Sequence, residues 1–186
     1  NHGMRVDADI MMLVGLDGRV IADIDGETRG KPFPYPRIFA DAVKAQRASV
    51  ITVVRGRLHE IVIVPVLAPV PIAWVAVGFN LDDNVVKDLS RLTGLDISFV
   101  SRHGDDTWRL QASTLAAPDR KSLLQDVAEN RLAVANEEGI VESTSGAVTR
   151  FRSLSAAGDD QVVAVLQQPI DAALEPFRRL QRQLAI

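Results

Sequence analysis

The sequence predicts an α+β fold built from two similar lobes, each an antiparallel sheet flanked by helices. Residues 10–93 run in the order strand pair, helix, three strands and closing helix, and residues 95–186 repeat that order in weaker form. The spacers between neighbouring strands are short, which favours antiparallel pairing because a parallel crossover takes about a dozen residues or more. We therefore place a first lobe at residues 1–93 and a second, smaller lobe at residues 94–186.

The first lobe begins with a predicted hairpin and a long irregular segment. Asp17-Gly18 separates two apolar runs, 10–14 and 20–22, and glycine accepts the positive φ that a tight turn requires. Residues 23–36 contain two glycines and three prolines, so we expect a loop that crosses one face of the sheet. The helix that follows has an apolar stripe made of Ile38, Phe39, Ala42 and Val43.

Three apolar runs, at 50–54, 61–67 and 72–79, predict the main strands of the first lobe. They are apolar at both alternating sets of positions, which is typical of a sheet covered on both faces. Pro65 cannot donate a ladder hydrogen bond, so we expect it at an edge or a bulge.

A helix that begins after Leu81-Asp82 closes the first lobe and ends at Gly94, because aspartate caps helix N-termini and glycine ends helices. The second lobe repeats the pattern with less apolar strands. Its expected elements are strands at 95–100 and 108–110, a helix that begins near Pro118, and strands at about 140–145, 147–155 and 161–168.

The last segment, residues 170–186, predicts a helix that leaves the second lobe. Its apolar residues follow a seven-residue spacing, as in a coiled-coil seam, but two heptads are too few to assign one. Those residues are Ile170, Ala173, Phe177, Leu180 and Leu184. The arginines on its other face are typical of a solvated surface, and a connector helix directed toward a membrane is the sharper hypothesis.

Composition excludes several classes of function. The chain has no cysteine, which excludes a disulfide scaffold, a cysteine zinc site and a thiol nucleophile. The net charge of −3 and the 5% of aromatic residues give no reason to expect nucleic acid as a partner. No apolar run reaches the ~20 residues that span a bilayer, so we expect any membrane helices to lie outside this sequence.

Catalytic and cofactor motifs are missing from the sequence. His2, His59 and His103 are not spaced as a helix-borne metal pair. There is no Gly-x-Ser-x-Gly motif, phosphate-binding loop or dinucleotide glycine fingerprint. The paired carboxylates lie at expected caps and turns, where acids serve local hydrogen bonding. We therefore expect no cofactor, no metal and no enzyme activity in this domain.

Five polar or aromatic residues beside the apolar sheet are candidates for ligand contact: Tyr35, Arg37, Arg55, His59 and Trp74. A small ligand with a carboxylate would use arginine as a planar donor pair beside an aromatic wall. Four of these residues also have an ordinary structural interpretation. Arg55 would lie at a solvated hairpin tip, Trp74 would fill the core, and Tyr35 and Arg37 would anchor the loop.

The chain resembles the extracytoplasmic Cache-type, PAS-like sensor domains of bacteria, particularly their double-lobed form. The resemblance is carried by residues 11–23 (MMLVGLDGRVIAD), 65–69 (PVLAP), 72–79 (IAWVAVGF) and 174–181 (LEPFRRLQ). The resemblance implies a periplasmic domain held between two membrane helices of an inner-membrane signal-transduction protein. The pattern across 65–79 is most similar to sensors attached to enzymes of cyclic-di-GMP metabolism, such as diguanylate cyclases and phosphodiesterases.

In that family the ligand lies in one lobe, between the sheet and the loop and helix over it, a position that corresponds to the five candidates named above. The amino-acid-binding motif of chemoreceptor members has no match here. The alternative hypothesis is a cytoplasmic, profilin-like interaction module without a small ligand. Apolar segments of about twenty residues flanking the domain in the whole gene would distinguish the two. The sequence leaves open the identity of the ligand and whether the full-length protein forms a homodimer.

Overall fold

A computed structural model describes residues 8–129, 140–142, 147–154 and 158–169. The chain divides into two compact units, residues 1–81 with 155–159 and residues 82–154 with 160–186. The predicted helix at the end of the first lobe thus belongs to the second unit, whereas the sequence analysis grouped it with the first. The predicted C-terminal connector helix and residues 1–7 lie outside the described residues.

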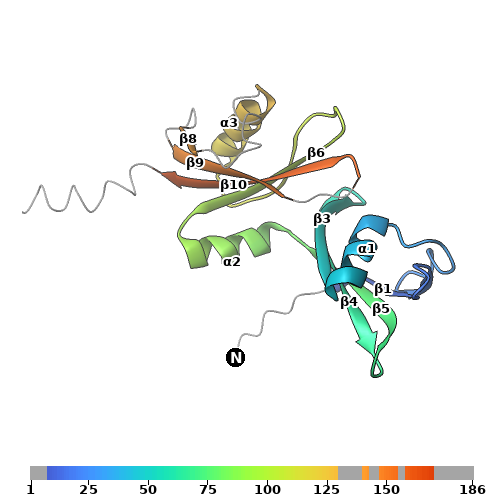
Figure 1. Cartoon of the computed structure of the whole chain (residues 1–186). Helices are drawn as coiled ribbons and strands as arrows, with labels where there is room; N and C mark the ends of the chain where they lie inside the picture. Colours follow the sequence, from blue (N-terminus) through green and yellow to red (C-terminus); the bar gives the residue numbers. More distant parts are fainter. Residues whose placement is uncertain (1–7, 130–139, 143–146, 155–157, 170–186) are drawn as a thin grey trace, which may run out of the picture. The chain divides into compact units, whose positions relative to one another are not determined.

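The first unit contains one five-stranded antiparallel sheet in the order β2-β1-β5-β4-β3 (Figure 1). Its elements are β1 (Ala8–Val14), β2 (Val20–Asp23), α1 (Pro36–Ala45), β3 (Ala48–Val54), β4 (Arg57–Leu67) and β5 (Pro71–Asn80). The expected strand pair, helix and three strands are therefore confirmed. β1, the earliest strand, lies between β2 and the central strand β5, and Met12 of β1 faces Ala76 of β5.

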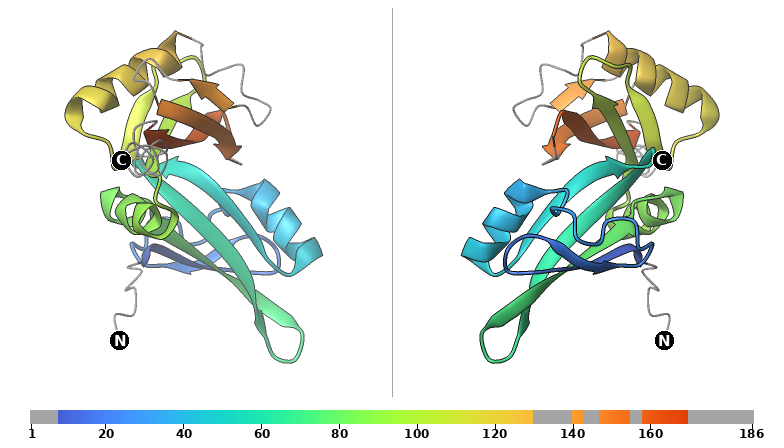
Figure 2. Two further views of the ribbon diagram at one scale, coloured as in Figure 1. Left: turned by 90° about the vertical axis from the view of Figure 1, so that its left-hand side faces the viewer. Right: turned by 90° about the vertical axis from the view of Figure 1, so that its right-hand side faces the viewer.

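Helix α1 covers one face of this sheet, and the segment before α1 lies on the same side (Figure 2). Phe33, Ile38 and Ala42 pack there against a strand face that includes Ile63 and Trp74. The Trp74 ring, 2% exposed, meets Phe39 edge-on at 5.9 Å between ring centroids. The stripe predicted for α1 is correct for Ile38 and Ala42, but Val43 is 48% exposed.

The other face of the first sheet is less covered than the sequence predicts. Met11 faces Val77 and Val64 faces Val75 on that side, and Met11 and Val64 are 45% and 37% exposed. The physical reason is that α1 and the long loop both lie over the same face, so the apolar residues on the opposite alternation lack cover from these two elements.

Pro65 lies where the sequence places it, on a locally open edge. Strand β3 begins at Ala48, which faces Ile63, so β4 continues past the end of its outer neighbour. Pro65 faces Trp74 of β5 on the other side, and the register shifts between Val66 and Leu67. A proline is tolerated at such a position because no neighbour requires its missing N–H.

Two tight turns set the registers of the first unit. The predicted Asp17-Gly18 turn is present, with Gly18 at φ 75° and its N–H donating to the Gly15 carbonyl at 3.0 Å. The two-residue turn from β3 to β4 has Arg55 at φ 50° and Gly56 at φ 78°. Two positive φ values define a type I′ hairpin, where arginine is unusual and asparagine or aspartate is preferred at the first position.

The second unit repeats the topology of the first. Its sheet has the order β7-β6-β10-β9-β8, the same arrangement of a strand pair followed by three strands. Its elements are α2 (Asp83–Thr93), β6 (Asp96–His103), β7 (Arg109–Ser113), α3 (Ala117–Ala128), β8 (Ile140–Glu142), β9 (Ala147–Leu154) and β10 (Asp160–Pro169). Helices α2 and α3 lie on opposite sides of this sheet (Figure 1), and β6 is buried on both alternations.

Helix α2 begins and ends as the sequence predicts and is bonded to the second sheet. Asp82 Oδ1 accepts hydrogen bonds from the N–H groups of Asn84 at 2.9 Å and Val85 at 3.1 Å. Gly94, at φ 71°, closes the helix by donating to the Ser90 carbonyl. The next residue after the cap, Asp83, accepts from the Ser113 N–H of β7 at 2.9 Å, which explains why α2 groups with the second unit.

The core of the second unit contains polar side chains as well as apolar ones. Leu123 and Val127 of α3 pack against Val100, Phe151 and Val165. On the same sheet face, the buried Gln167 Nε2 donates to Thr149 Oγ1 at 3.1 Å, while Gln167 Oε1 has no partner within the described part of the chain.

Candidate ligand site

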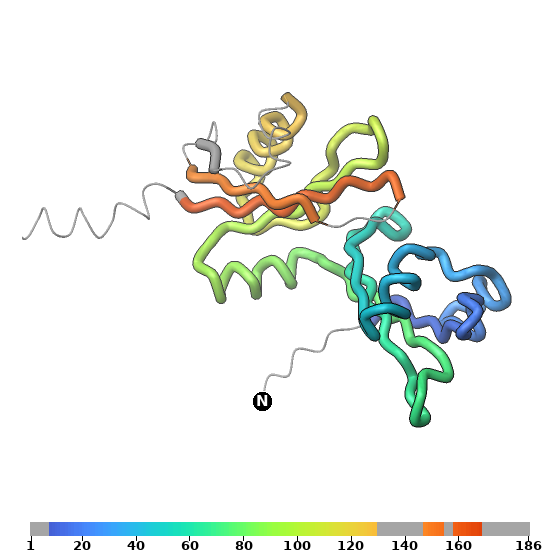
Figure 3. The backbone as a smooth tube through the Cα atoms, viewed as in Figure 1, coloured from blue at the N-terminus to red at the C-terminus, as the bar shows by residue number. Residues whose placement is uncertain are grey.

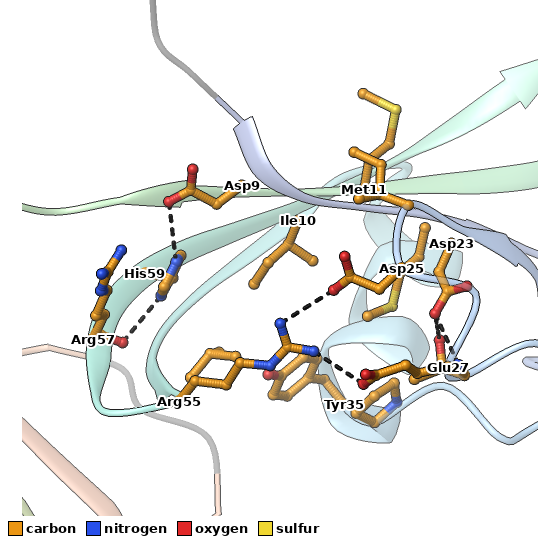
Figure 4. Close-up of a pocket in the computed structure, with 15 residues that line it drawn as sticks. Asp9, Ile10, Met11, Asp23, Asp25, Glu27, Tyr35, Arg55, Arg57 and His59 are labelled. Carbon is orange, nitrogen blue, oxygen red and sulfur yellow. Dashed lines mark hydrogen bonds and ion pairs between the residues drawn. The ribbon is translucent and has the colours of Figure 1, made fainter.

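A cavity of about 450 Å³ opens in the first unit between β1, the β3–β4 turn and the loop that follows β2. It has the size of a typical small-molecule pocket. Figure 4 shows its labelled lining residues: Asp9, Ile10, Met11, Asp23, Asp25, Glu27, Tyr35, Arg55, Arg57 and His59. The tube in Figure 3 shows how the segment after β2 bends back before it enters α1.

Asp23, the last residue of β2, organises the loop on one side of the cavity. Its Oδ2 accepts hydrogen bonds from the Thr28 N–H at 2.8 Å and the Thr28 hydroxyl at 2.5 Å. The Thr28 hydroxyl is the main reason that the pKa of Asp23 is lowered. Backbone N–H groups of Thr28, Gly26 and Glu27 act in the same direction, while partial burial opposes them. Oδ1 is buried and has no hydrogen-bond partner among the described residues.

Arg55 fastens this loop to the β3–β4 turn. Its Nη1 lies 3.2 Å from Asp25 Oδ2 and its Nη2 lies 3.0 Å from Glu27 Oε2. All three side chains are about half or more exposed, so each pair is weak on its own. The guanidinium group lies between the turn that carries it and the acidic side chains of the loop (Figure 4).

His59 lines the cavity near Asp9, away from the Arg55 ion pairs (Figure 4). The ring is buried, its Nδ1 lies 3.0 Å from the Arg57 carbonyl and its Nε2 lies 3.6 Å from Asp9 Oδ2. A carbonyl only accepts, so the first contact assigns a proton to Nδ1. When the ring is neutral, Nε2 carries no proton and faces the Asp9 carboxylate as an acceptor. When the ring is charged, Nε2 carries a proton and can donate to that carboxylate.

The structure brings three of the five sequence candidates to this cavity. Tyr35, Arg55 and His59 line it. Trp74 lies within the core cluster, and Arg37 lines a separate hollow beside α1 instead. Arg55 is engaged with acidic side chains, so it is not an open donor pair of the kind proposed for a ligand carboxylate.

Three acidic residues of the cavity, Asp9, Asp25 and Glu27, were not among the residues predicted to contact a ligand. The alternation of acids in Asp23-Ile24-Asp25-Gly26-Glu27 is a visible signal, but in sequence it looks like an ordinary solvated loop. Within the described ranges, no group of three or more histidine, cysteine or acidic side chains could hold a metal ion.

The double sensory domain of two-component sensor kinases (dCache_3) has a family model that matches residues 3–174. The chain belongs to this family. The Cache resemblance predicted from the sequence is confirmed, and the dCache domain is a sensory module rather than a catalytic one. No curated protein matches the chain.

Among solved structures, this dCache chain is similar to three distant proteins, and each alignment covers 87% of this chain. An extracellular ligand binding receptor from Desulfohalobium retbaense has 14% identity and a TM-score of 0.45, and the alignment covers 30% of that chain. The Pseudomonas aeruginosa amino acid chemoreceptor PctC, in complex with GABA, has 15% identity and a TM-score of 0.44, and the alignment covers 74% of that chain. The sensor domain of the Vibrio cholerae histidine kinase DctB has 15% identity and a TM-score of 0.44, and the alignment covers 72% of that chain.

None of the helices in the described part of the dCache chain is long and apolar enough to cross a membrane.

Proposed function

We propose that this dCache chain is the extracytoplasmic ligand-sensing part of a membrane-bound bacterial signal-transduction protein, and that the ligand binds in the first unit. The observation that carries the proposal is the cavity beside β1, closed on one side by a loop that two exposed ion pairs hold in place. Membership in a sensory family favours this function over the profilin-like interaction module.

The proposed mechanism is a population shift. A ligand that binds more tightly when the loop is closed shifts the equilibrium toward the closed state. The free energy of this shift is set by the difference between its affinities for the two states. The loop can respond because its ion pairs are exposed and weak, whereas the sheet beneath it is packed against a buried core. We propose that the signal leaves through the chain after Pro169, toward a second membrane helix and a cyclic-di-GMP enzyme.

The site residues are proposed as Tyr35, Arg55 and His59, together with the acidic loop. Arg37 and Trp74 remain candidates for indirect roles. Arg37 lines the neighbouring hollow beside α1, and Trp74 packs in the core of the first unit.

A thermal-shift screen of small metabolites on the 186-residue chain tests the ligand-sensing proposal. A ligand at 100 times its Kd should add about 2.7 kcal/mol of stability. The shift should shrink in Tyr35→Ala and persist in Arg109→Ala, an exposed arginine of the second unit. If no metabolite shifts the midpoint, or if Tyr35→Ala has no effect on a ligand that does, the cavity is not the sensory site.

Fusions of the whole gene test the location and the output separately. A periplasm-dependent reporter enzyme joined after Asn80 should be active if the domain is extracytoplasmic. Cellular cyclic-di-GMP should change on ligand addition if the output is a cyclase or phosphodiesterase. An inactive reporter contradicts the location, and unchanged cyclic-di-GMP with altered kinase or chemoreceptor signalling contradicts the output alone.

A further inference from the structure

We propose that the cavity of the first unit binds a small organic cation, an aliphatic amine, with its ammonium group at the acidic loop. This inference rests on the proposed function, because it names the class of ligand that the sensory cavity takes. It differs from the carboxylate ligand that the arginines of the sequence would suit.

The charge of the lining favours a cation. Four carboxylates line the cavity, and only two guanidinium groups accompany them. The acids are Asp9, Asp23, Asp25 and Glu27, and the bases are Arg55 and Arg57. The lining is therefore acidic by two charges when His59 is neutral, and a ligand cation is attracted whichever carboxylate it approaches first.

Arg55 is poorly placed to receive an anion. Both of its terminal nitrogens already face carboxylates, Asp25 at 3.2 Å and Glu27 at 3.0 Å. An incoming carboxylate would have to separate these pairs and would leave two further negative charges beside it. An ammonium group can instead share the same oxygens, and it loses little by competing with Arg55 because the pairs are exposed to solvent.

Asp23 adds a negative charge at the base of the loop. Its Oδ2 accepts hydrogen bonds from Thr28, and its Oδ1 is buried without a partner in the described part of the chain. Because Oδ1 is not accessible from the cavity, a ligand ammonium group interacts with Asp23 through its charge rather than through a hydrogen bond. The lowered pKa of Asp23 keeps this group a carboxylate at neutral pH.

The rest of the cavity suits an alkyl chain rather than a hydrated ion. Ile10, Met12 and Val54 contribute apolar surface to the lining, and Pro34 and Tyr35 complete it on the loop side. The carboxylates of the described residues are not clustered closely enough to hold a metal ion. Acidic groups at the rim over an apolar floor are the arrangement that binds an amine through its charge and its methylene groups together.

Isothermal titration of the 186-residue chain with four compounds of one length tests the proposal. The probes are butylamine, 1,4-diaminobutane, 4-aminobutyrate and butyrate, in phosphate buffer of fixed ionic strength without amine buffers. We expect the two amines to bind and butyrate not to bind. The double variant Asp25→Asn, Glu27→Gln should weaken amine binding by about tenfold or more, since one tenfold step in Kd is ~1.4 kcal/mol. The control Asp106→Asn, an exposed acid of the second unit, should change nothing.

The variant Arg55→Gln separates the two charge hypotheses. If the ligand is a cation, removal of this competing guanidinium group should tighten amine binding several-fold. If the ligand is an anion, the same variant should abolish its binding. Preference for butyrate or 4-aminobutyrate over the amines, with loss in Arg55→Gln, would overturn the amine proposal and leave the sensory function standing. Amine binding that persists in the Asp25 and Glu27 double variant would overturn the site, and no binding of any probe would overturn the ligand class.

Discussion

Arg55 and Glu27 lie 28 positions apart in the sequence and are joined by a 3.0 Å ion pair between Nη2 and Oε2. The pair links a hairpin turn to the loop over the cavity, and it forms from a backbone position, φ 50°, that is unfavourable for arginine. Arg55 thus occupies an unfavourable backbone position while its side chain joins the turn to the loop beside the cavity.

Replacing Arg55 with asparagine should separate these two roles. Asparagine accepts positive φ more readily, and the lost exposed ion pairs contribute only about 0–1 kcal/mol, so stability should stay within about 1 kcal/mol of wild type or rise. Amides of residues 24–30 should exchange faster with solvent because the loop is released. The control is Arg57→Asn on the same hairpin, which keeps both ion pairs. Unchanged exchange in the loop would show that Arg55 does not restrain it.

Truncating Trp74 to alanine should lower the free energy of unfolding by about 3–5 kcal/mol, because the ring is 2% exposed and packs in the main core. Ile72→Ala, two residues earlier and 53% exposed, should stay within about 0.5 kcal/mol. Chemical denaturation measures both. In Trp74→Phe, ligand binding should survive; its loss with stability retained would make Trp74 a direct ligand contact.

The Asp23 carboxylate should make stability depend on acid. Its folded pKa is below 3.8, the ordinary value of an aspartate, chiefly because of the Thr28 hydroxyl, so its contribution is present above that pH and is lost as the pH falls through the folded pKa. Asp23→Asn should therefore melt lower than wild type near neutral pH, and the difference should close under strongly acidic conditions. Equal melting temperatures near neutral pH would contradict this assignment. Thr28→Val should reproduce part of the effect.

Adding a methyl group at Gly78 should reach the cavity through Ile10. A Cβ at Gly78 would lie 2.8 Å from the Ile10 Cβ, so Gly78→Ala should cost about 1–3 kcal/mol and move Ile10, a lining residue. Adding Ile10→Gly removes all three close contacts, at 2.8, 3.0 and 3.2 Å, and should restore part of the stability. Thermal unfolding of the two variants checks this. If the double variant is as unstable as the sum of its single changes, the contact is not the cause.

The buried amide of Gln167 should be replaceable only together with its partner. Thr149→Val removes the acceptor of Gln167 Nε2 and should cost about 1–3 kcal/mol. Adding Gln167→Leu removes the amide itself, including an Oε1 that has no partner among the described residues, and should recover most of the loss. A double-mutant cycle in denaturant measures the coupling. An additive cycle would mean that the two side chains act independently.

The fold could be predicted from local signals in the sequence. Asp17-Gly18 sets the first hairpin, the glycines and prolines of 23–36 exclude regular structure, and Asp82 with Gly94 bounds α2, because each acts on its own backbone. The repeated order of elements along the chain follows from these signals, and both units have it. The grouping of α2 was less accessible, since it depends on the hydrogen bond from the Ser113 N–H to Asp83.

The cavity could be predicted only in part. Tyr35 and His59 stood out as an aromatic and an imidazole beside apolar strands, and both line it. Asp25 and Glu27 did not, because acids in a glycine-rich loop are ordinary until the fold brings Arg55 to them. The sequence also did not show that Trp74 lies on the buried face of β5. Alternation places it with Ala76 on one side of β5, but only the position of α1 makes that side the closed one.

The strand order also bears on how the chain is made. In each sheet the first strand of the unit, β1 or β6, pairs with the last, β5 or β10. A chain that emerges from its N-terminus cannot complete the first sheet before Asn80 is available, nor the second before residues 160–169 are. Such long-range pairing slows folding. One edge of β1 stays unpaired until β5 is made, and one edge of β6 stays unpaired until β10 is made. The two units therefore mature one after the other, and the second depends on nearly the whole sequence.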